Sequence, residues 1–269
     1  MRCESIESLS IPKIGFGTWR IGGSSSADSS KDTDGLKALR SALELGYTHF
    51  DTAEIYAGGH AEDLIGRAIR EAGVPRESLF ITSKVTPGHL RFNDVLRACE
   101  ASLSRLAMDY LDLYLIHWPG PGAGLPDTFR ALNRLVTEGK VSHLGVSNFN
   151  LKLLQESRML SETPILTDQV PYSVSDRTYA QNGVLSYCQA NDILLTAYSP
   201  VDEGRLRPGK ALMSIALAHR ATPYQIALAW LVSQRRVITI PMSQNPIHQR
   251  QNLEAAEIVL RESEIAQLA

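Results

Sequence analysis

Short apolar segments alternate with longer amphipathic ones along the chain, and this alternation predicts strands and helices in turn. The stretch from Ser5 to Pro12 alternates apolar and polar residues, as in a small β-hairpin. The predicted strands that follow are rich in leucine, β-branched and aromatic residues and cover 14–19, 47–51, 79–84, 111–117, 141–147, 165–169, 193–198 and 237–241. The predicted helices cover 33–45, 61–72, 93–107, 127–138, 150–158, 177–190, 211–218, 223–233 and 261–269.

Eight strands separated by helices predict parallel pairing through right-handed crossovers, and eight such units can close into a (β/α)₈ TIM barrel. A doubly wound open sheet is the alternative, but such a sheet commonly carries a G-x-G-x-x-G turn, and the sequence contains none. The length of 269 residues, 43% of them hydrophobic, suits one large α/β domain. We therefore expect residues 1–269 to form a single (β/α)₈ barrel domain with a short N-terminal β-hairpin.

Closure of a barrel would bring the ends of all strands to one rim, where enzymes with this fold carry their catalytic groups. Several predicted strand ends are polar, and a tyrosine follows the second one; these residues are Asp51, Tyr56, Lys84, His117, Ser147, Asn148, Gln169 and Tyr198. Each has an ordinary structural explanation when taken alone, such as a helix cap for Asn148 or a surface lysine for Lys84. Their occurrence together at one rim indicates a catalytic site.

Composition and charge exclude several other classes of protein. The 27 lysines and arginines nearly balance the 29 aspartates and glutamates and form no basic block, so neither a nucleic acid nor a membrane is expected as a partner. Cys3, Cys99 and Cys188 lie far apart without metal-ligand spacing, which indicates reduced thiols and no metal site. The sequence shows neither a signal peptide nor an apolar run of membrane-spanning length. We expect a cytoplasmic monomer that acts on a small molecule.

Six segments of the sequence together resemble the aldo-keto reductase family, in a bacterial-type branch. They are Gly15–Trp19, Asp51–Tyr56, Ile81–Lys84, Asp109–Trp118, Gly139–Phe149 and Ala197–Pro200, and the resemblance extends from end to end of the chain. It implies a barrel that binds a nicotinamide cofactor without a Rossmann fold and reduces aldehydes and ketones to alcohols. The implied cofactor is NADPH, with NADH possible.

The resemblance also implies a catalytic tetrad of Asp51, Tyr56, Lys84 and His117. When hydride reaches a carbonyl carbon, negative charge builds on the carbonyl oxygen and a proton must arrive there. A free tyrosine, with a pKa of about 10, holds its proton too tightly to be an ideal acid at neutral pH. We therefore expect Lys84 to lower the pKa of Tyr56, the general acid, while Asp51 keeps Lys84 charged. His117 would orient the carbonyl oxygen as a neutral donor or help to relay the proton.

By the same resemblance, further residues contact the cofactor and the substrate. Ser147, Asn148 and Gln169 match the contacts to the nicotinamide carboxamide, and Tyr198 matches the ring that stacks on the nicotinamide. Trp19 and Trp118 would line the substrate pocket. The other implied cofactor contacts are Gly17, Thr18, Ser199, Pro200, Val201, Pro241, Met242, Ser243, His248, Arg250, Gln251 and Asn252.

The implied site for the cofactor's 2′-phosphate lies at the start of a helix. Asn245 is expected to cap this helix and Pro246 to occupy its first position, so that the backbone donors of the helix N-terminus face an anion. Ser243 fits as one further ligand of the phosphate, and Asn252 as a contact to the adenine.

This phosphate site departs from the family's pattern at two positions. Relatives selective for NADPH commonly carry a lysine in place of Met242 and an arginine in place of His248. Arg250 is turned about 200° away from His248 on a helix, so it is expected to substitute only in part. We expect NADPH to remain preferred over NADH, but by less than in relatives with both cations.

Two other functions remain open at this point. A Schiff-base aldolase could use Lys84 as its nucleophile, although Asp51 and Tyr56 argue against it. A non-catalytic NADP-binding sensor or regulatory subunit of the same family would keep the same cofactor residues. The segments Gly120–Leu125 and Val201–Lys210 are short and no tail follows the last predicted helix, so we expect an open pocket whose physiological substrate the sequence does not identify.

Overall fold

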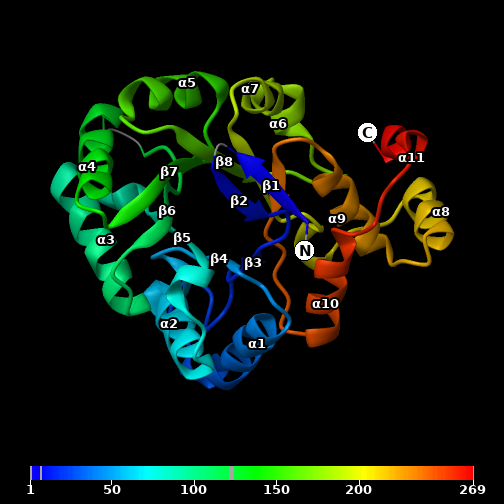
Figure 1. Ribbon diagram of the computed structural model, residues 1–269, viewed down its shortest axis with the longest axis horizontal. Coiled ribbons are helices and arrows are strands. Elements are labelled where there is room, and N and C mark those ends of the chain that lie inside the picture. The colour runs from blue at the N-terminus through cyan, green and yellow to red at the C-terminus, as the bar shows by residue number, and fades with distance from the viewer. Residues whose placement is uncertain (1, 7, 121–123, 269) are drawn as a thin grey trace.

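A parallel eight-stranded sheet, surrounded by helices, forms the centre of the protein (Figure 1). The computed structural model describes residues 2–6, 8–120 and 124–268. The strands of the sheet follow one another in chain order: β3 (Phe16–Gly17), β4 (His49–Asp51), β5 (Phe80–Val85), β6 (Leu111–Ile116), β7 (Val141–Ser147), β8 (Ile165–Pro171), β9 (Leu194–Tyr198) and β10 (Val237–Thr239). The eight predicted strands are confirmed, with shorter bounds at the first, second, fourth, seventh and eighth.

The sheet closes on itself between its first and last strands. The backbone N–H of Gly15 donates to the Thr239 carbonyl at 2.8 Å, and the Thr239 N–H donates to the Lys13 carbonyl at 2.9 Å. These bonds lie just before β3, where Ile14 forms a parallel bridge with Thr239. The predicted (β/α)₈ barrel is therefore confirmed.

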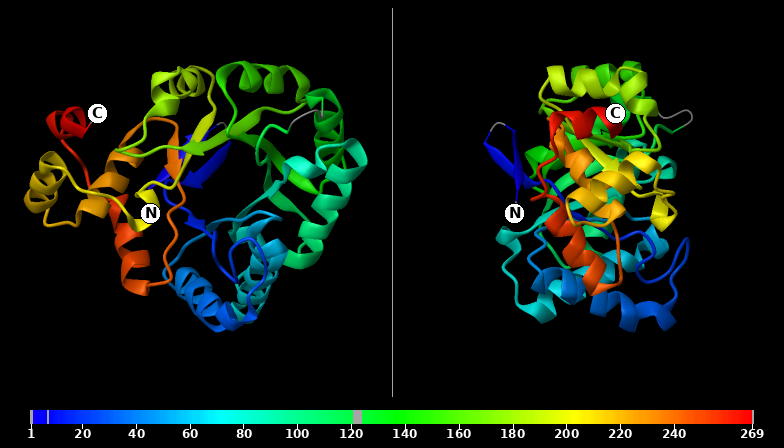
Figure 2. Two further views of the ribbon diagram at one scale, coloured as in Figure 1. Left: turned by 180° about the vertical axis from the view of Figure 1, so that it is seen from behind. Right: turned by 90° about the vertical axis from the view of Figure 1, so that its right-hand side faces the viewer.

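Helices cover the outside of the sheet, and Figure 2 shows the same ring from behind and from the side. They are α1 (Asp32–Glu44), α2 (His60–Ala72), α3 (Phe92–Leu106), α4 (Leu125–Thr137), α5 (Leu151–Leu160), α6 (Thr178–Gln181), α7 (Val184–Ala190), α8 (Lys210–Ala218), α9 (Pro223–Ser233), α10 (Pro246–Ala255) and α11 (Glu262–Leu268). Short 3₁₀ turns are η1 (Ser29–Lys31), η2 (Tyr56–Gly59), η3 (Arg76–Ser78), η4 (Pro87–His89) and η5 (Asp202–Gly204). Residue 269, included in the last predicted helix, lies outside the described residues.

One helix prediction is wrong. The segment 177–190 forms two short helices, α6 and α7, instead of one. Gly183 between them has φ 90°, a left-handed conformation that a continuous helix does not contain. The Asn182 side chain accepts a hydrogen bond from the N–H of Val184, the first residue of the second helix.

The predicted N-terminal hairpin is confirmed as β1 (Cys3–Ile6) paired with β2 (Leu9–Pro12), and it closes the amino end of the barrel. Residue 7, at its turn, lies outside the described residues. Ile6 and Ile11 are buried in one apolar cluster with side chains from the barrel strands, including Leu113 and Ile238. Lys13 anchors the hairpin's end, because its ammonium donates to the Gln234 carbonyl at 2.9 Å and the Val237 carbonyl at 3.0 Å. No helix in the described part of the chain combines the length and apolarity that crossing a membrane requires.

The packing of α2 on α3 depends on a glycine. A Cβ added at Gly66 would lie 2.2 Å from the Leu106 carbonyl oxygen, closer than two such atoms can approach. Leu106 is the last residue of α3, so its backbone cannot move aside as a flexible side chain could. Gly66 therefore sets how closely the two helices approach.

We expect Gly66→Ala to lower the free energy of unfolding by about 1–3 kcal/mol, the usual cost of overpacking. Urea denaturation measures it. Gly88→Ala is the control, because a Cβ at Gly88 would meet nothing within 4 Å, and its effect should stay within about 0.5 kcal/mol. Equal stability of the two variants would contradict the close helix contact.

Candidate functional site

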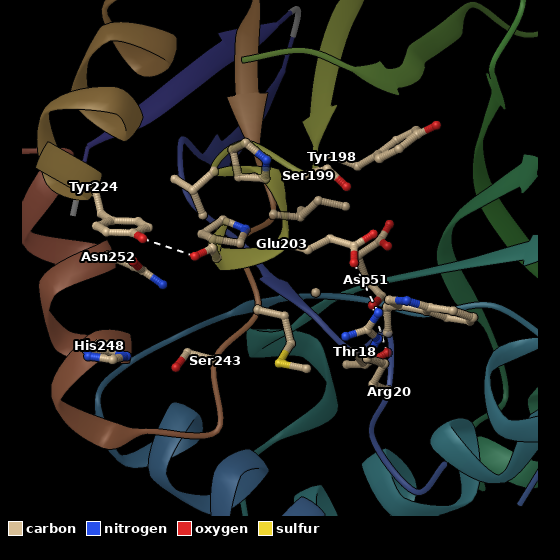
Figure 3. A pocket seen from close by; sticks show the side chains of 18 of the residues that line it. Thr18, Arg20, Asp51, Tyr198, Ser199, Glu203, Tyr224, Ser243, His248 and Asn252 are labelled. Carbon is tan, nitrogen blue, oxygen red and sulfur yellow. Dashed lines mark hydrogen bonds and ion pairs between the residues drawn. The ribbon is translucent and has the colours of Figure 1, made fainter. Parts of the chain in front are cut away.

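A cavity of about 940 Å³ opens where the carboxyl ends of the strands meet (Figure 3). Most of the predicted site residues line it: Gly17, Thr18, Trp19, Asp51, Tyr56, His117, Trp118, Ser147, Gln169, Tyr198, Ser199, Pro200, Val201, Pro241, Met242, Ser243, His248, Gln251 and Asn252. Lys84, Asn148 and Arg250 are the predicted site residues that are not part of this lining. Within the described ranges, no group of three or more His, Cys, Asp and Glu side chains is placed to hold a metal ion.

Lys84 lies under the cavity floor in a buried ion pair. Asp51 pairs with Thr82 in the register of β4 and β5, so Lys84, two residues further, projects on the same side of the sheet. The Lys84 ammonium donates to Asp51 Oδ1 at 2.6 Å and to the Thr52 carbonyl at 2.7 Å. The two charged side chains are 0% and 1% exposed, so both depend on protein partners in place of water.

Two further contacts complete this group. Gln169 Nε2 donates to Asp51 Oδ2 at 2.7 Å, so both carboxylate oxygens accept a hydrogen bond. On its other side, the Lys84 ammonium donates to the Tyr56 hydroxyl oxygen at 3.3 Å. A chain of polar contacts therefore runs from Gln169 through the ion pair to the hydroxyl of Tyr56, which lines the cavity.

Burial and charge shift the pKa values of Lys84 and Tyr56. Burial acts to lower the pKa of Lys84, but the charges and hydrogen bonds of Asp51 and Tyr56 outweigh it, so the pKa is raised overall. Burial raises the pKa of Tyr56, and the nearby Lys84 ammonium opposes this rise only in part. The expected effect of Lys84, which lowers the tyrosine pKa, is present, but the net shift of the pKa is upward because the loss of hydration around a phenolate outweighs its attraction to Lys84. Tyr56 therefore keeps its proton at neutral pH.

His117 faces Tyr56 across the cavity. Its ring stacks on the Trp118 ring at 4.0 Å between centroids and meets the Tyr56 ring edge-on at 5.7 Å. Burial, together with the charge of Lys84, lowers the pKa of His117 to about 2. The imidazole is therefore neutral at physiological pH and can donate one hydrogen bond. The Trp19 ring contacts Tyr56 from another side at 5.1 Å.

Of the residues expected to contact the nicotinamide carboxamide, only some face the cavity. Ser147 and Gln169 line it, but the Asn148 side chain lies behind this surface. Asn148 Nδ2 donates to the His117 carbonyl at 3.1 Å, and Asn148 Oδ1 accepts from the Tyr198 hydroxyl at 2.8 Å. Asn148 adopts a left-handed conformation with φ 63°, which aims its side chain at both partners. It therefore connects the backbone beside His117 to Tyr198.

The expected phosphate site lies at the start of α10. Asn245 caps this helix by accepting from the Ile247 N–H at 2.9 Å, and a proline follows it, as predicted. Ser243 and His248 line the cavity close by (Figure 3). Arg250 is exposed and does not line it, in agreement with its expected direction on the helix.

The segment from Ser199 to Gly204 bridges two sides of the cavity. Glu203 accepts from Arg20 at 3.0 Å, and the Gly204 carbonyl accepts from the Tyr224 hydroxyl at 3.0 Å (Figure 3). Ser199, with φ 49°, and Glu203, with φ 54°, have left-handed backbones. The cavity is thus more covered here than the short segment predicted. Of the other segment expected to leave it open, residues 121–123 lie outside the described residues.

Several lining residues were missed by the sequence analysis: Arg20, Ile55, Glu203, Gly204, Thr222, Pro223, Tyr224, Gln225 and Ile240. The pattern Thr222-Pro223-x-Gln225 is a recognisable helix start, and the capping box is present, but nothing in the pattern places that helix start beside a cavity. Arg20 and Glu203 are 183 residues apart, so no local pattern could pair them.

A second buried carboxyl group lies outside the barrel interior. Asp168 precedes Gln169 on β8 and therefore points away from the cavity. Its Oδ1 accepts from the Phe149 N–H at 3.4 Å, and its Oδ2 has no hydrogen-bond partner among the described residues. Burial raises the pKa of Asp168 well above its ordinary value.

Comparison with known proteins supports one family throughout. The model of the aldo/keto reductase family matches residues 13–269. Methylglyoxal reductase YeaE of Escherichia coli K12 is 39% identical over 97% of this chain and 90% of its own length. The thermostable aldo-keto reductase Tm1743, solved with the inhibitor epalrestat, has a TM-score of 0.97 and 45% identity, covering 100% of this chain and 98% of the other. A Klebsiella pneumoniae aldo/keto reductase, solved with NADP and acetate, has a TM-score of 0.88 and 36% identity, covering 99% and 93%.

We expect Asp168→Asn to become more stable than the wild type as pH rises. The native carboxyl holds its proton above the pH at which the unfolded one, with a pKa of about 3.9, loses it. The free energy of unfolding of the wild type therefore falls by up to about 1.4 kcal/mol per pH unit until the pH reaches the raised pKa of the native carboxyl. Asparagine does not titrate, so the variant shows no such fall. Denaturation at pH 5 and pH 8 measures the difference, with Asp34→Asn, at a 72% exposed side chain, as control. A difference that stays constant between these pH values would contradict a protonated Asp168.

Proposed function

Because the chain belongs to the aldo/keto reductase family, we propose that it reduces small dicarbonyl aldehydes of the methylglyoxal type, with Tyr56 as proton donor. The broader activity is NADPH-dependent reduction of aldehydes and ketones. The observation that supports the role of Tyr56 is the contact of its hydroxyl with a buried lysine that Asp51 holds in place.

The residues along the cavity suit a nicotinamide dinucleotide. Tyr198 offers an aromatic ring at one end. At the other end, the capped N-terminus of α10, Ser243 and His248 offer donors to a phosphate. When bound, NADPH supplies hydride to the carbonyl carbon of the substrate.

The proton then comes from the protein. The Tyr56 hydroxyl gives its proton to the carbonyl oxygen, on which negative charge builds. The Lys84 ammonium, 3.3 Å away, stabilises the tyrosinate that remains, and the ion pair with Asp51 keeps this lysine charged. Neutral His117 donates a hydrogen bond to the same carbonyl oxygen and orients it.

The substrate class follows from the mouth of the cavity and from the relatives. Trp19 and Trp118 line the cavity beside Tyr56 and His117, and their flat rings suit small planar carbonyl compounds. The Escherichia coli relative is a methylglyoxal reductase, which is a reductase of such a compound. We expect aldehydes to be reduced faster than simple ketones, because the tetrad supplies chemistry while few groups bind a larger substrate.

The structure disfavours the aldolase alternative. A Schiff-base lysine must lose its proton to attack a carbonyl, whereas the pKa of Lys84 is raised by Asp51 and Tyr56 against the effect of burial. Lys84 also lies outside the cavity lining. A non-catalytic sensor of the same family would bind NADPH without turnover, so measured turnover separates it from the reductase.

We also infer that the protein acts as a monomer in the cytoplasm. Cys99 and Cys188 are buried as thiols, which suits a reducing compartment. Asp51, Tyr56, Lys84 and His117 contact one another within one chain, which suits a monomer.

We expect Tyr56→Phe to lower kcat for methylglyoxal by about 10²-fold or more, the usual scale of a general acid's contribution. The affinity for NADPH should change little, because only the hydroxyl is lost. Lys84→Met should have a similar effect, since the tyrosinate loses its cation. NADPH oxidation measures the rates, and Tyr187→Phe, on α7 and outside the cavity lining, is the control. Reduction by Tyr56→Phe at the wild-type rate would assign the proton to another group.

Cofactor preference should be modest. Losing one charge-assisted hydrogen bond costs roughly 1.5–3 kcal/mol, about 10–100-fold in affinity, and Met242 supplies no charge. We expect NADPH to bind more tightly than NADH, because Ser243, His248 and the N-terminus of α10 offer donors to the 2′-phosphate that NADH lacks. Dissociation constants of both cofactors measure the ratio.

Two variants identify the residue responsible for this preference. His248→Leu should lower the ratio, because the side chain no longer offers a donor to the phosphate, whereas Arg250→Leu, at an exposed position outside the cavity lining, should leave it nearly unchanged. Tighter binding of NADH, or an NADPH preference above about 10³-fold, would refute this account of the phosphate site.

A further inference from the structure

Glu54 lies between two residues of the tetrad in the chain but points away from the cavity. It is not part of the cavity lining, and its side chain is only 8% exposed. Its Oε1 accepts a hydrogen bond from the Thr86 N–H at 2.6 Å. Both of its carboxylate oxygens also lie 3.1 Å from Nδ1 of His89, whose side chain is 53% exposed.

These contacts tie the loop that carries Tyr56 to the strand that carries Lys84. Thr86 follows the end of β5, two residues after Lys84. The Glu54 N–H also donates to the Lys84 carbonyl, at 3.3 Å. The loop is thus bonded to the segment around Lys84 once through its backbone and once through the Glu54 carboxylate.

The other backbone hydrogen bonds around Tyr56, from the Ala57 N–H to the Ser24 carbonyl at 2.8 Å and from the Tyr56 N–H to the Ala53 carbonyl at 3.0 Å, do not join the loop to the segment around Lys84. Tyr56 begins a 3₁₀ turn in which Ala57, with φ 52°, and Gly58, with φ 63°, are left-handed, so the turn is not a regular element that would set the position by itself. Lys84 cannot follow a displaced tyrosine, because Asp51 and Thr52 hold its ammonium at 2.6 and 2.7 Å. A shift of the loop would therefore lengthen the contact between Lys84 and Tyr56.

We propose that Glu54 is a positioning residue of this enzyme, whose carboxylate, by binding the Thr86 N–H, fixes the distance between Tyr56 and Lys84. The proposal rests on the proposed role of Tyr56 as proton donor. Glu54 itself touches neither the cavity nor the reacting atoms. It acts by keeping the hydroxyl of Tyr56 within reach of the ammonium that must stabilise its conjugate base.

The ionisable groups around Glu54 are few. His89 faces it from η4. Tyr114 of β6 interacts electrostatically with the Glu54 carboxylate, but the Tyr114 hydroxyl is buried and has no hydrogen-bond partner in the described part of the chain. The Thr86 N–H needs a hydrogen-bond acceptor but does not need a negative charge. A glutamine at position 54 can therefore replace the carboxylate at this contact.

The donor side of the contact can be removed without changing Glu54. Thr86 has φ −74° and ψ 154°, backbone angles that proline adopts readily, and its N–H donates to Glu54. Thr86→Pro therefore deletes the hydrogen bond from the opposite partner. Glu54→Ala and Thr86→Pro should then have equal effects that do not add in the double variant, since both remove the same bond.

The experiment compares Glu54→Ala, Glu54→Gln, Thr86→Pro and the double variant Glu54→Ala with Thr86→Pro. His89→Ala is the matched control, because it removes the exposed neighbour of Glu54 and keeps the Thr86 contact. Wild type and Tyr56→Phe are measured in the same assay, so that a failure of the proposed function is seen separately. The measurements are kcat for methylglyoxal over a pH range, the dissociation constant for NADPH, and the thermal unfolding midpoint, which confirms that each variant is folded.

We expect Glu54→Ala and Thr86→Pro to lower kcat by about 10-fold or more, with the NADPH dissociation constant unchanged. The alkaline limb of the pH profile should move to higher pH in both, because a more distant Lys84 lowers the pKa of Tyr56 less. Glu54→Gln and His89→Ala should stay within about 2-fold of the wild type, and the double variant should match the single ones.

Other outcomes would overturn the proposal. A folded Glu54→Ala protein with the wild-type kcat and pH profile would show that the contact does not position Tyr56. A Glu54→Gln protein as slow as Glu54→Ala would show that the charge matters, and not the hydrogen bond. Additive losses in the double variant would show that Glu54 and Thr86 act separately. Full activity of Tyr56→Phe would instead reject the proposed acid.

Discussion

The buried ion pair of Lys84 and Asp51 is the interaction on which the site depends. An unpaired ammonium at 0% exposure would cost several kcal/mol of lost hydration, so the lysine is stable there only while its partners are in place. Asp51 and the Thr52 carbonyl, from one segment, bind the ammonium, and Gln169 of β8 binds the other carboxylate oxygen of Asp51. Closure of the barrel is what brings these two segments together. The proposed catalytic geometry and the stability of the rim therefore depend on the same set of bonds.

Around this pair, charged and uncharged groups have different places. Lys84 lies beneath the cavity and Asp51 reaches its lining, while Tyr56 and His117, the groups proposed to meet the substrate, are kept uncharged by burial. A neutral acid and a neutral donor avoid repelling or trapping a polar substrate before charge develops on it. In the proposed mechanism, the charge that stabilises the product of proton transfer is already present on Lys84, 3.3 Å from the phenol oxygen.

The strands, most helices and the residues of the rim could be predicted from the sequence. The spacing of apolar residues and the positions of strand ends are local properties that the sequence shows directly. The break at Gly183 could not, since a glycine within an amphipathic stretch is compatible with one helix or two. The effect of Lys84 on the pKa of Tyr56 could be predicted, but the net upward shift could not, because it depends on how deeply the ring is buried, which no spacing reveals. The pair of Arg20 and Glu203 was missed because folding alone joins positions so far apart.

The contacts that close the barrel between its first and last strands also set an order of events during synthesis. Lys13 and the Val237 carbonyl that it binds are separated by 224 residues. At roughly 5–20 residues per second, a ribosome needs about 10–45 seconds to make the intervening chain. Until β10 has been made, the edge of β3 that will face it has no partner strand. The hairpin also lacks Ile238, with which it later shares an apolar cluster. The nascent protein must therefore stay protected from pairing with other chains until almost its last strand has emerged.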